Sequence, residues 1–134
     1  MLTLKKTALG LAALLLASWP VTTQADDAGM TSFQQYCATC HGVDAKGAGP
    51  LTDLLTEKVP DLTGLSARND GVFPMLDVLH IIDGRTGLRG HGGPMPVYGA
   101  LFDAEVGAGD DFGPILYTRG KILSIAMYLE GIQQ

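Results

Sequence analysis

An all-α fold is the class that this sequence predicts, on three observations. Apolar residues recur at helical spacing over residues 75–82 and again over residues 115–129. No stretch shows the alternation of apolar and polar residues that a half-buried strand requires. Many of the glycines gather between the apolar stretches, over residues 84–113. We therefore expect a small number of helices joined by irregular loops.

The first 25 residues have the features of an export signal. Lys5 and Lys6 give a charged start, residues 7–19 are apolar, and Thr23-Gln24-Ala25 supplies small residues at a cleavage point. The apolar run is short for a membrane span of about 20 residues, and an uncleaved N-terminal anchor is the alternative. We expect export to the periplasm, cleavage after Ala25, and one soluble domain, residues 26–134, without stable insertion in a membrane.

Caps and breakers predict the elements of this domain in order. Thr31 is expected to cap a first helix that carries Phe33 and Tyr36 and runs into two cysteines. Glycines indicate a loop over residues 41–60 with a short turn near its middle, and a short helix is expected over residues 61–69.

The second half of the domain is predicted to hold two helices and one long loop. Pro74 fits the first turn of a third helix, which Gly84 ends. Residues 84–113 are predicted as a loop, and a loop of that length in a compact domain is usually functional. The last helix is expected from about Pro114 to about Leu129.

The motif Cys37-Ala38-Thr39-Cys40-His41 carries the most specific chemistry in the chain. C-x-x-C-H is the pattern for covalent attachment of haem, in which each thiol forms a thioether with a vinyl group. The histidine then lies beneath the iron as its proximal ligand. A thioredoxin-like pair or a structural disulfide does not need that histidine. A zinc site needs further ligands, and the only other histidines are His80 and His91. We therefore expect one haem c, bound through Cys37 and Cys40 with His41 on the iron.

Met95 is the predicted second ligand of the iron. The sequence GGPMP over residues 92–96 places it on a loop that two prolines make rigid. His91, four residues earlier, is the rival ligand, and His80 on the third helix is expected to have no such role. A thioether ligand raises the reduction potential and closes the iron to oxygen and most substrates, which favours electron transfer over catalysis. The other methionines of the exported domain lie in or beside predicted helices, where packing is the expected role: Met30, Met75 and Met127.

The charge balance is acidic, with 14 acidic and 9 basic residues and a formal net charge of −5. Cleavage removes Lys5 and Lys6 and makes the domain more acidic still. This balance argues against nucleic acid as a partner and favours a redox protein with a basic docking face. Residues 103–111 hold four of the acidic side chains and are a candidate interface: Asp103, Glu105, Asp110 and Asp111.

Taken in order, these motifs resemble those of class I monohaem cytochromes c of the exported bacterial type. Gly29, Phe33 and Cys37 have the spacing with which such chains open, and Tyr128 matches the aromatic of their last helix, which packs near that glycine. The resemblance implies a small cytochrome c fold, with three to five helices wrapped around one covalently attached haem. It covers nearly all of residues 26–134.

The resemblance also implies roles for residues around the iron. In the family, a Gly-Pro pair follows the histidine and its proline carbonyl accepts a hydrogen bond from the ligand's other ring nitrogen, and Gly49-Pro50 stands where that pair is expected. The family's second ligand lies in a Met-Pro sequence followed by an aromatic and a glycine, as over residues 95–99 here. Three side chains are candidates to bind the haem propionates: Tyr98, Arg85 and Arg89.

The sequence thus predicts a soluble periplasmic electron carrier and not an enzyme, with His41 and Met95 as axial ligands. One alternative is a haem-bearing, electron-accepting subunit of an oxidoreductase, with residues 103–111 in an interface. Another is a haem enzyme or sensor with an open iron site.

Overall fold

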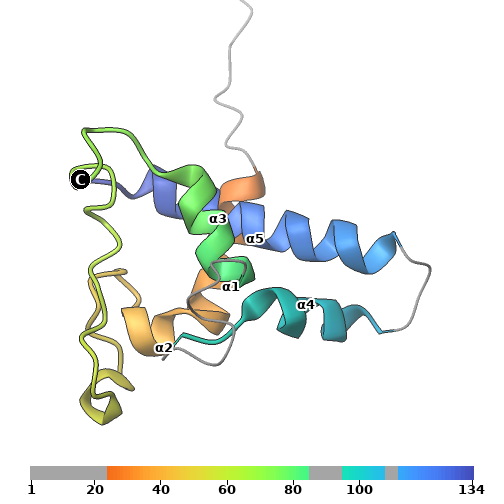
Figure 1. Cartoon of the computed structure of the whole chain (residues 1–134), viewed down its shortest axis with the longest axis horizontal. Coiled ribbons are helices and arrows are strands. Elements are labelled where there is room, and N and C mark those ends of the chain that lie inside the picture. Colours follow the sequence, from red (N-terminus) through yellow and green to blue (C-terminus); the bar gives the residue numbers. More distant parts are fainter. Residues whose placement is uncertain (1–23, 85–94, 108–111) are drawn as a thin grey trace, which may run out of the picture.

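The computed structural model describes residues 24–84, 95–107 and 112–134, and within them the fold is all-α, as predicted (Figure 1). No strand occurs in these described ranges. The helices are α1 (Gln24–Tyr36), α2 (Ala38–His41), the 3-10 helix η1 (Thr52–Leu54), α3 (Met75–Asp83), α4 (Tyr98–Val106) and α5 (Gly113–Gly131).

The crossing of α1 over α5 is the centre of the fold. Gly29 lies so close to α5 that a Cβ atom there would be 2.9 Å from the Cβ of Tyr128 and would also press on the Ser124 carbonyl. Phe33, fully buried one turn later, packs on the Tyr128 ring at 5.3 Å between centroids. The predicted packing of Tyr128 on the first helix is confirmed, and the small residue is what permits it.

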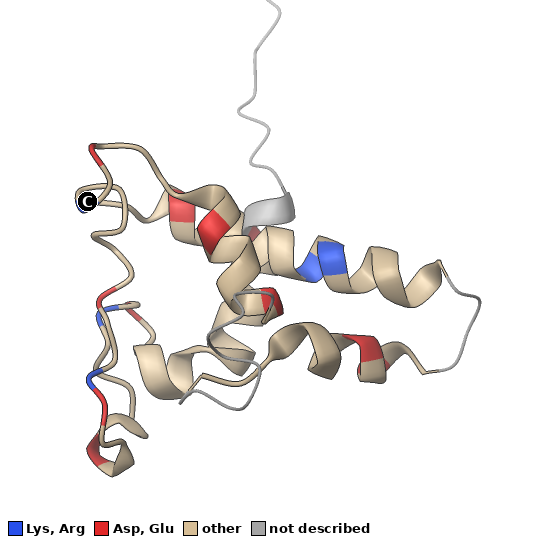
Figure 2. Cartoon of the chain, viewed as in Figure 1, with Lys and Arg blue, Asp and Glu red and all other residues tan. Residues whose placement is uncertain are grey.

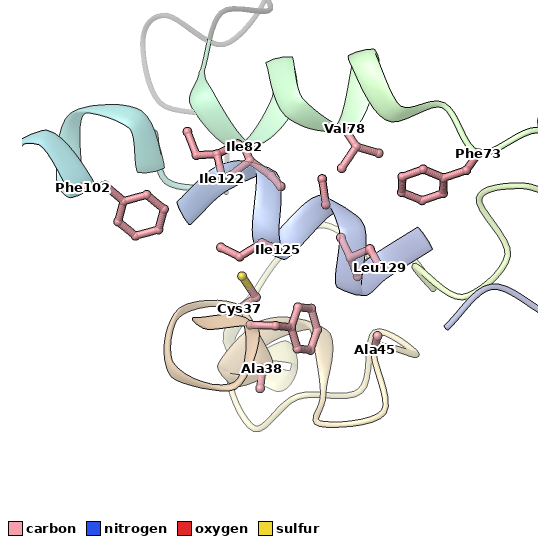
Figure 3. Packing of buried hydrophobic residues seen from close by; sticks show 12 residues of the cluster. Cys37, Ala38, Ala45, Phe73, Val78, Ile82, Phe102, Ile122, Ile125 and Leu129 are labelled. Carbon is pink, nitrogen blue, oxygen red and sulfur yellow. The ribbon is translucent and has the colours of Figure 1, made fainter. Parts of the chain in front are cut away.

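The hydrophobic core lies between α5 and the elements around it (Figure 3). From above α5, α3 supplies Val78 and Ile82, while Ile125 and Leu129 come from α5 itself. Cys37 and its neighbour Ala38 close the core from below, where α1 passes into α2. The core is therefore built directly around the C-x-x-C-H segment.

Two local predictions in the first half are wrong. Thr31 lies inside α1, because the helix already runs from Gln24 and the packing of Gly29 on α5 stabilises the turns before Thr31. Residues 61–69 form successive turns and no helix. The Asp61 carboxylate there accepts bonds from both the N–H and the hydroxyl of Thr63, at 2.8 and 2.7 Å, and such local capping competes with a helix.

The predicted long loop over residues 84–113 is also wrong, because α4 occupies part of it. Phe102 is fully buried, and Gly99 passes so close to Asp83 that a Cβ would lie 2.7 Å from its backbone oxygen. Packing of these two residues, which local sequence does not reveal, makes the segment helical. The predictions for α3 and α5 are confirmed, including the left-handed Gly84 (φ 87°) that ends α3.

Figure 1 shows α4 running beside α5, with α2 near the N-terminal end of α4. None of the helices in the described part of the chain has both the length and the apolar character needed to cross a membrane.

Candidate functional site

A cavity of about 360 Å³ opens on the C-x-x-C-H segment. Its volume lies in the range of small-molecule and cofactor sites. Apolar side chains from four elements form most of the wall, and they include Phe33, Leu62, Leu65, Val78, Ile82, Ile125 and Leu129. Five of the six site residues predicted from sequence line this one cavity: Cys37, Cys40, His41, Met95 and Tyr98. Residues far apart in the sequence thus meet around one apolar space.

A tight helical turn presents the two cysteines. The N–H groups of Cys40 and His41 both donate to the Cys37 carbonyl, at 3.1 and 2.9 Å, and the Cys37 N–H donates to the Phe33 carbonyl. Both thiols are free, and burial raises the pKa of Cys37 to about 12, with the nearby Cys40 adding to the shift. A redox dithiol works through a lowered pKa. A buried neutral thiol facing an apolar cavity instead suits attachment of an apolar group.

The imidazole of His41 has the character of a metal ligand. Burial lowers the pKa of this ring and favours its neutral form, while the nearby Pro60 backbone opposes the shift. Since proline has no N–H, the Pro60 group is the carbonyl oxygen. Atom Nδ1 is buried and has no hydrogen-bond partner among the described residues. A largely buried imidazole with an unpartnered ring nitrogen can serve as a metal ligand.

Pro60, and not Pro50, lines the cavity beside the imidazole, and the carbonyl role expected of Pro50 stays a prediction. Pro50 is exposed and is not among the residues that line the cavity. The preceding glycine has a packing role, because a Cβ on Gly49 would lie 2.6 Å from the Ala38 carbonyl oxygen. The Gly49 N–H donates to the Cys40 carbonyl at 3.0 Å. The Gly49-Pro50 pair thus packs on α2.

Met95 and Tyr98 approach the cavity from the segment that begins α4. Met95 is half-buried and packs against the hydrophobic core. The Tyr98 hydroxyl donates to the backbone carbonyl of Tyr36 at 2.5 Å, so its proton is already used within the protein. Burial raises the pKa of Tyr98 to about 12. This bond joins the Met95 segment to the residue before Cys37, and the predicted propionate contact of Tyr98 stays a prediction.

Several candidates lie elsewhere. Arg85, Arg89 and His91 fall outside the described residues. His80 lies on α3 and lines a separate hollow between α3 and α5, with Arg119 across from it. Of the described histidines, only His41 borders the larger cavity.

The acidic segment is partly bound to the rest of the protein. Glu105 accepts from Lys121 at 2.6 Å, from the Tyr36 hydroxyl at 2.7 Å and from the Tyr117 hydroxyl at 3.2 Å. Asp103 accepts from the Thr118 hydroxyl. Both carboxylates therefore fasten α4 to its neighbours, while Asp110 and Asp111 lie outside the described residues.

Charge is distributed unevenly over the described residues. Figure 2 shows acidic residues spread over helices and loops, whereas the described basic residues lie on α5 and in the segment between α2 and α3. Glu57 and Lys58, one of each sign, line the cavity itself.

These features fit a covalently bound haem. Two free thiols, a neutral histidine with an unpartnered buried nitrogen and a thioether border a cavity whose wall is otherwise mainly apolar. A protein-family model described as Cytochrome c matches residues 27–108, which is more than half of the chain and includes all of these groups. Searches of curated proteins and of solved structures returned no match.

Proposed function

Since this chain belongs to the cytochrome c family, we propose that it is a periplasmic carrier of single electrons with one His/Met-ligated haem c. Membership of the family indicates haem-based electron transfer between redox partners. The observation that carries the finer proposal is the convergence of Cys37, Cys40, His41 and Met95 on one cavity.

Each side chain of the cavity has a distinct part in this proposal. Cys37 and Cys40 form the two thioethers, and the helical turn between them keeps His41 beneath the iron. Pro60 lies beside the imidazole ring, and Met95 would supply sulfur to the iron from the segment that begins α4. When bound, the haem iron takes up and releases one electron. The apolar wall excludes water, and this lowers the polarity around the cofactor.

The tie between Tyr98 and Tyr36 supports Met95 as a permanent ligand. Tyr98 follows Met95 by three residues, and its hydroxyl bonds the carbonyl next to Cys37. The Met95 segment is therefore fastened to the haem-attachment segment by a contact only 2.5 Å long. A sixth position filled in this way leaves no open site for a substrate, which supports a carrier over an enzyme.

The partner that suits this chain is a redox protein with a basic docking face. The formal charge of −5 supports this choice. In 0.1 M salt, the attraction between exposed charges is largely screened beyond a separation of about 10 Å. We expect electron-transfer rates with such a partner to fall as salt rises. Rates that do not depend on salt would remove charge from the docking account.

A second candidate is an electron-accepting subunit of an oxidoreductase. Large apolar side chains are exposed on α4 and at the start of α5: Phe112 is 74% exposed, Leu116 68% and Leu101 45%. Exposed apolar patches mark interaction surfaces. Co-purification with a larger catalytic protein would favour this reading over a free carrier.

Mass spectrometry of the exported protein tests the main proposal. We expect a mature chain that begins at Asp26 and carries one haem through denaturation. Single Cys37→Ala and Cys40→Ala variants should each lose one of the two thioethers. A chain with no covalent haem when expressed with the export and attachment machinery would overturn the proposal.

A further inference from the structure

The C-terminal end of α5 is hydrogen-bonded to the loop that carries Pro60 (Figure 1). The side-chain amide of Gln133 donates through Nε2 to the carbonyls of Leu62, at 2.9 Å, and Leu129, at 2.6 Å. Its Oε1 accepts from the Ser66 N–H at 2.9 Å. One side chain near the end of the chain thus makes three hydrogen bonds, two of them to one loop.

The loop also depends on contacts made by its own residues. The Leu62 N–H donates to the Ala45 carbonyl at 2.8 Å, and Arg68 donates to the Asp61 carbonyl at 2.6 Å. A Cβ on Gly47 would lie 3.1 Å from the Pro60 carbonyl oxygen, so the backbones approach closely there. Among the described residues, the Gln133 side chain supplies the side-chain hydrogen bonds that join this loop to the end of α5.

We infer that Gln133 is a positioning residue for the axial ligand: it fastens the 60–66 loop, which lines the cavity beside His41, to the end of α5. This inference rests on the proposed function, since it concerns the iron-binding imidazole. Leu62, whose carbonyl receives the Gln133 bond, lies two residues from Pro60 and lines the cavity. Leu65, beside Ser66, lines it as well. Movement of this loop therefore reaches both the ligand and the cavity wall.

The chemistry of the side chain explains why glutamine suits this position. The amide offers two N–H donors and one acceptor oxygen, and all three functions are used here. An ionised glutamate keeps the acceptor for Ser66 but cannot donate to Leu62 or Leu129. An alanine removes all three bonds and leaves the backbone in place.

The test measures solvent exchange of the His41 ring N–H in the haem-loaded protein by NMR, in Gln133→Ala and Gln133→Glu. The Ser66 amide is followed in the same samples. We expect exchange of the ring proton to be at least tenfold faster in Gln133→Ala, which corresponds to about 1.4 kcal/mol. The matched control is Gln134→Ala, because the bond of Gln134 to the Thr63 carbonyl comes from its backbone N–H. In Gln134→Ala, the His41 ring proton should exchange at the rate of the parent protein.

A second control separates positioning from general loss of stability. Thr118→Val removes the bond to Asp103 between α5 and α4, away from the loop. It should lower the melting temperature without changing exchange at His41. In Gln133→Glu, the Ser66 amide should stay protected while the His41 ring proton exchanges faster. This variant keeps the test valid even if Gln133→Ala does not fold. Ring-proton exchange within twofold of the parent in Gln133→Glu would overturn the inference.

The proposed function and the role of Gln133 are contradicted by different results. Absence of covalent haem in the parent protein contradicts the proposed function. A haem-loaded parent in which both Gln133 variants match Gln134→Ala contradicts only the role of Gln133.

Discussion

Phe102 anchors α4, and its removal gives the sharpest stability prediction. The ring is fully buried, lies 5.1 Å from the Tyr36 ring and 5.6 Å from the Tyr98 ring, and has the Lys121 ammonium 4.5 Å from its centroid. Truncating a buried phenylalanine to alanine costs about 3–5 kcal/mol. That is a large part of the roughly 5–15 kcal/mol by which a domain is stable.

The assay is reversible denaturation of the haem-loaded protein, followed by far-ultraviolet circular dichroism. A loss of about 3 kcal/mol lowers the melting temperature of a domain of this size class by about 12 °C or more. Phe112→Ala is the matched control, because that ring is 74% exposed. It should change stability by less than about 0.5 kcal/mol.

Loss of the Phe102 ring should also affect the segment that carries Met95. Tyr98 packs on Phe102 and belongs to the segment that carries Met95. In Phe102→Ala, the signal of methionine on iron should therefore weaken at a lower temperature than the helical signal. A loss below about 1 kcal/mol, or equal losses in the two variants, would refute the packing argument for α4.

Three further predictions follow from other contacts. Gly29→Ala places a Cβ 2.9 Å from the Tyr128 Cβ and should lower the free energy of unfolding by about 1–3 kcal/mol. Gly120→Ala, in the middle of α5, adds a Cβ that meets nothing within 4 Å and should raise the free energy of unfolding by up to about 1 kcal/mol. Chemical denaturation measures both variants, and equal effects would contradict the packing of Gly29 on α5. Hydrogen bonds from Lys121 and then Tyr36 lower the pKa of Glu105, so its stabilisation is present above the ordinary value of 4.5 and is lost as the pH falls through the lowered one. Acid unfolding should accordingly be less steep in Glu105→Gln than in the parent protein, and identical acid profiles would count against this network. Preventing haem attachment with the double variant Cys37→Ala, Cys40→Ala should leave a chain with little helicity by circular dichroism, because the core is built around the cavity; native helicity would be the opposite result.

The sequence alone was sufficient for the residues whose chemistry is local. C-x-x-C-H places two thiols and an imidazole on one turn whatever surrounds them, and the structure has them there. The packing of Tyr128 near Gly29 was predictable from the resemblance to class I cytochromes c, whose last helix carries an aromatic near that glycine. The ends of α3 followed from Pro74 and Gly84 for similarly local reasons.

The remaining features depend on contacts between distant residues. α4 lies within a glycine-rich stretch that suggests a loop, and the packing of Gly99 and Phe102 makes the helix favourable. Pro60 follows His41 by a long irregular stretch, so nothing local distinguished it from Pro50. The Tyr98 hydroxyl bonds a carbonyl 62 residues earlier, and Gln133 bonds an amide 67 residues earlier. No periodicity or motif reports such pairs.

The central claim is that His41 and Met95 both bind the iron of a covalently attached haem. The most direct measurement is the absorption spectrum of the ferric protein, in the weak long-wavelength band of methionine sulfur on iron. The account predicts that this band is present in the parent protein, is lost in Met95→Ala, and persists in Met127→Ala, whose side chain is 38% exposed on α5. A covalent haem without that band, or a band that survives Met95→Ala, would contradict it.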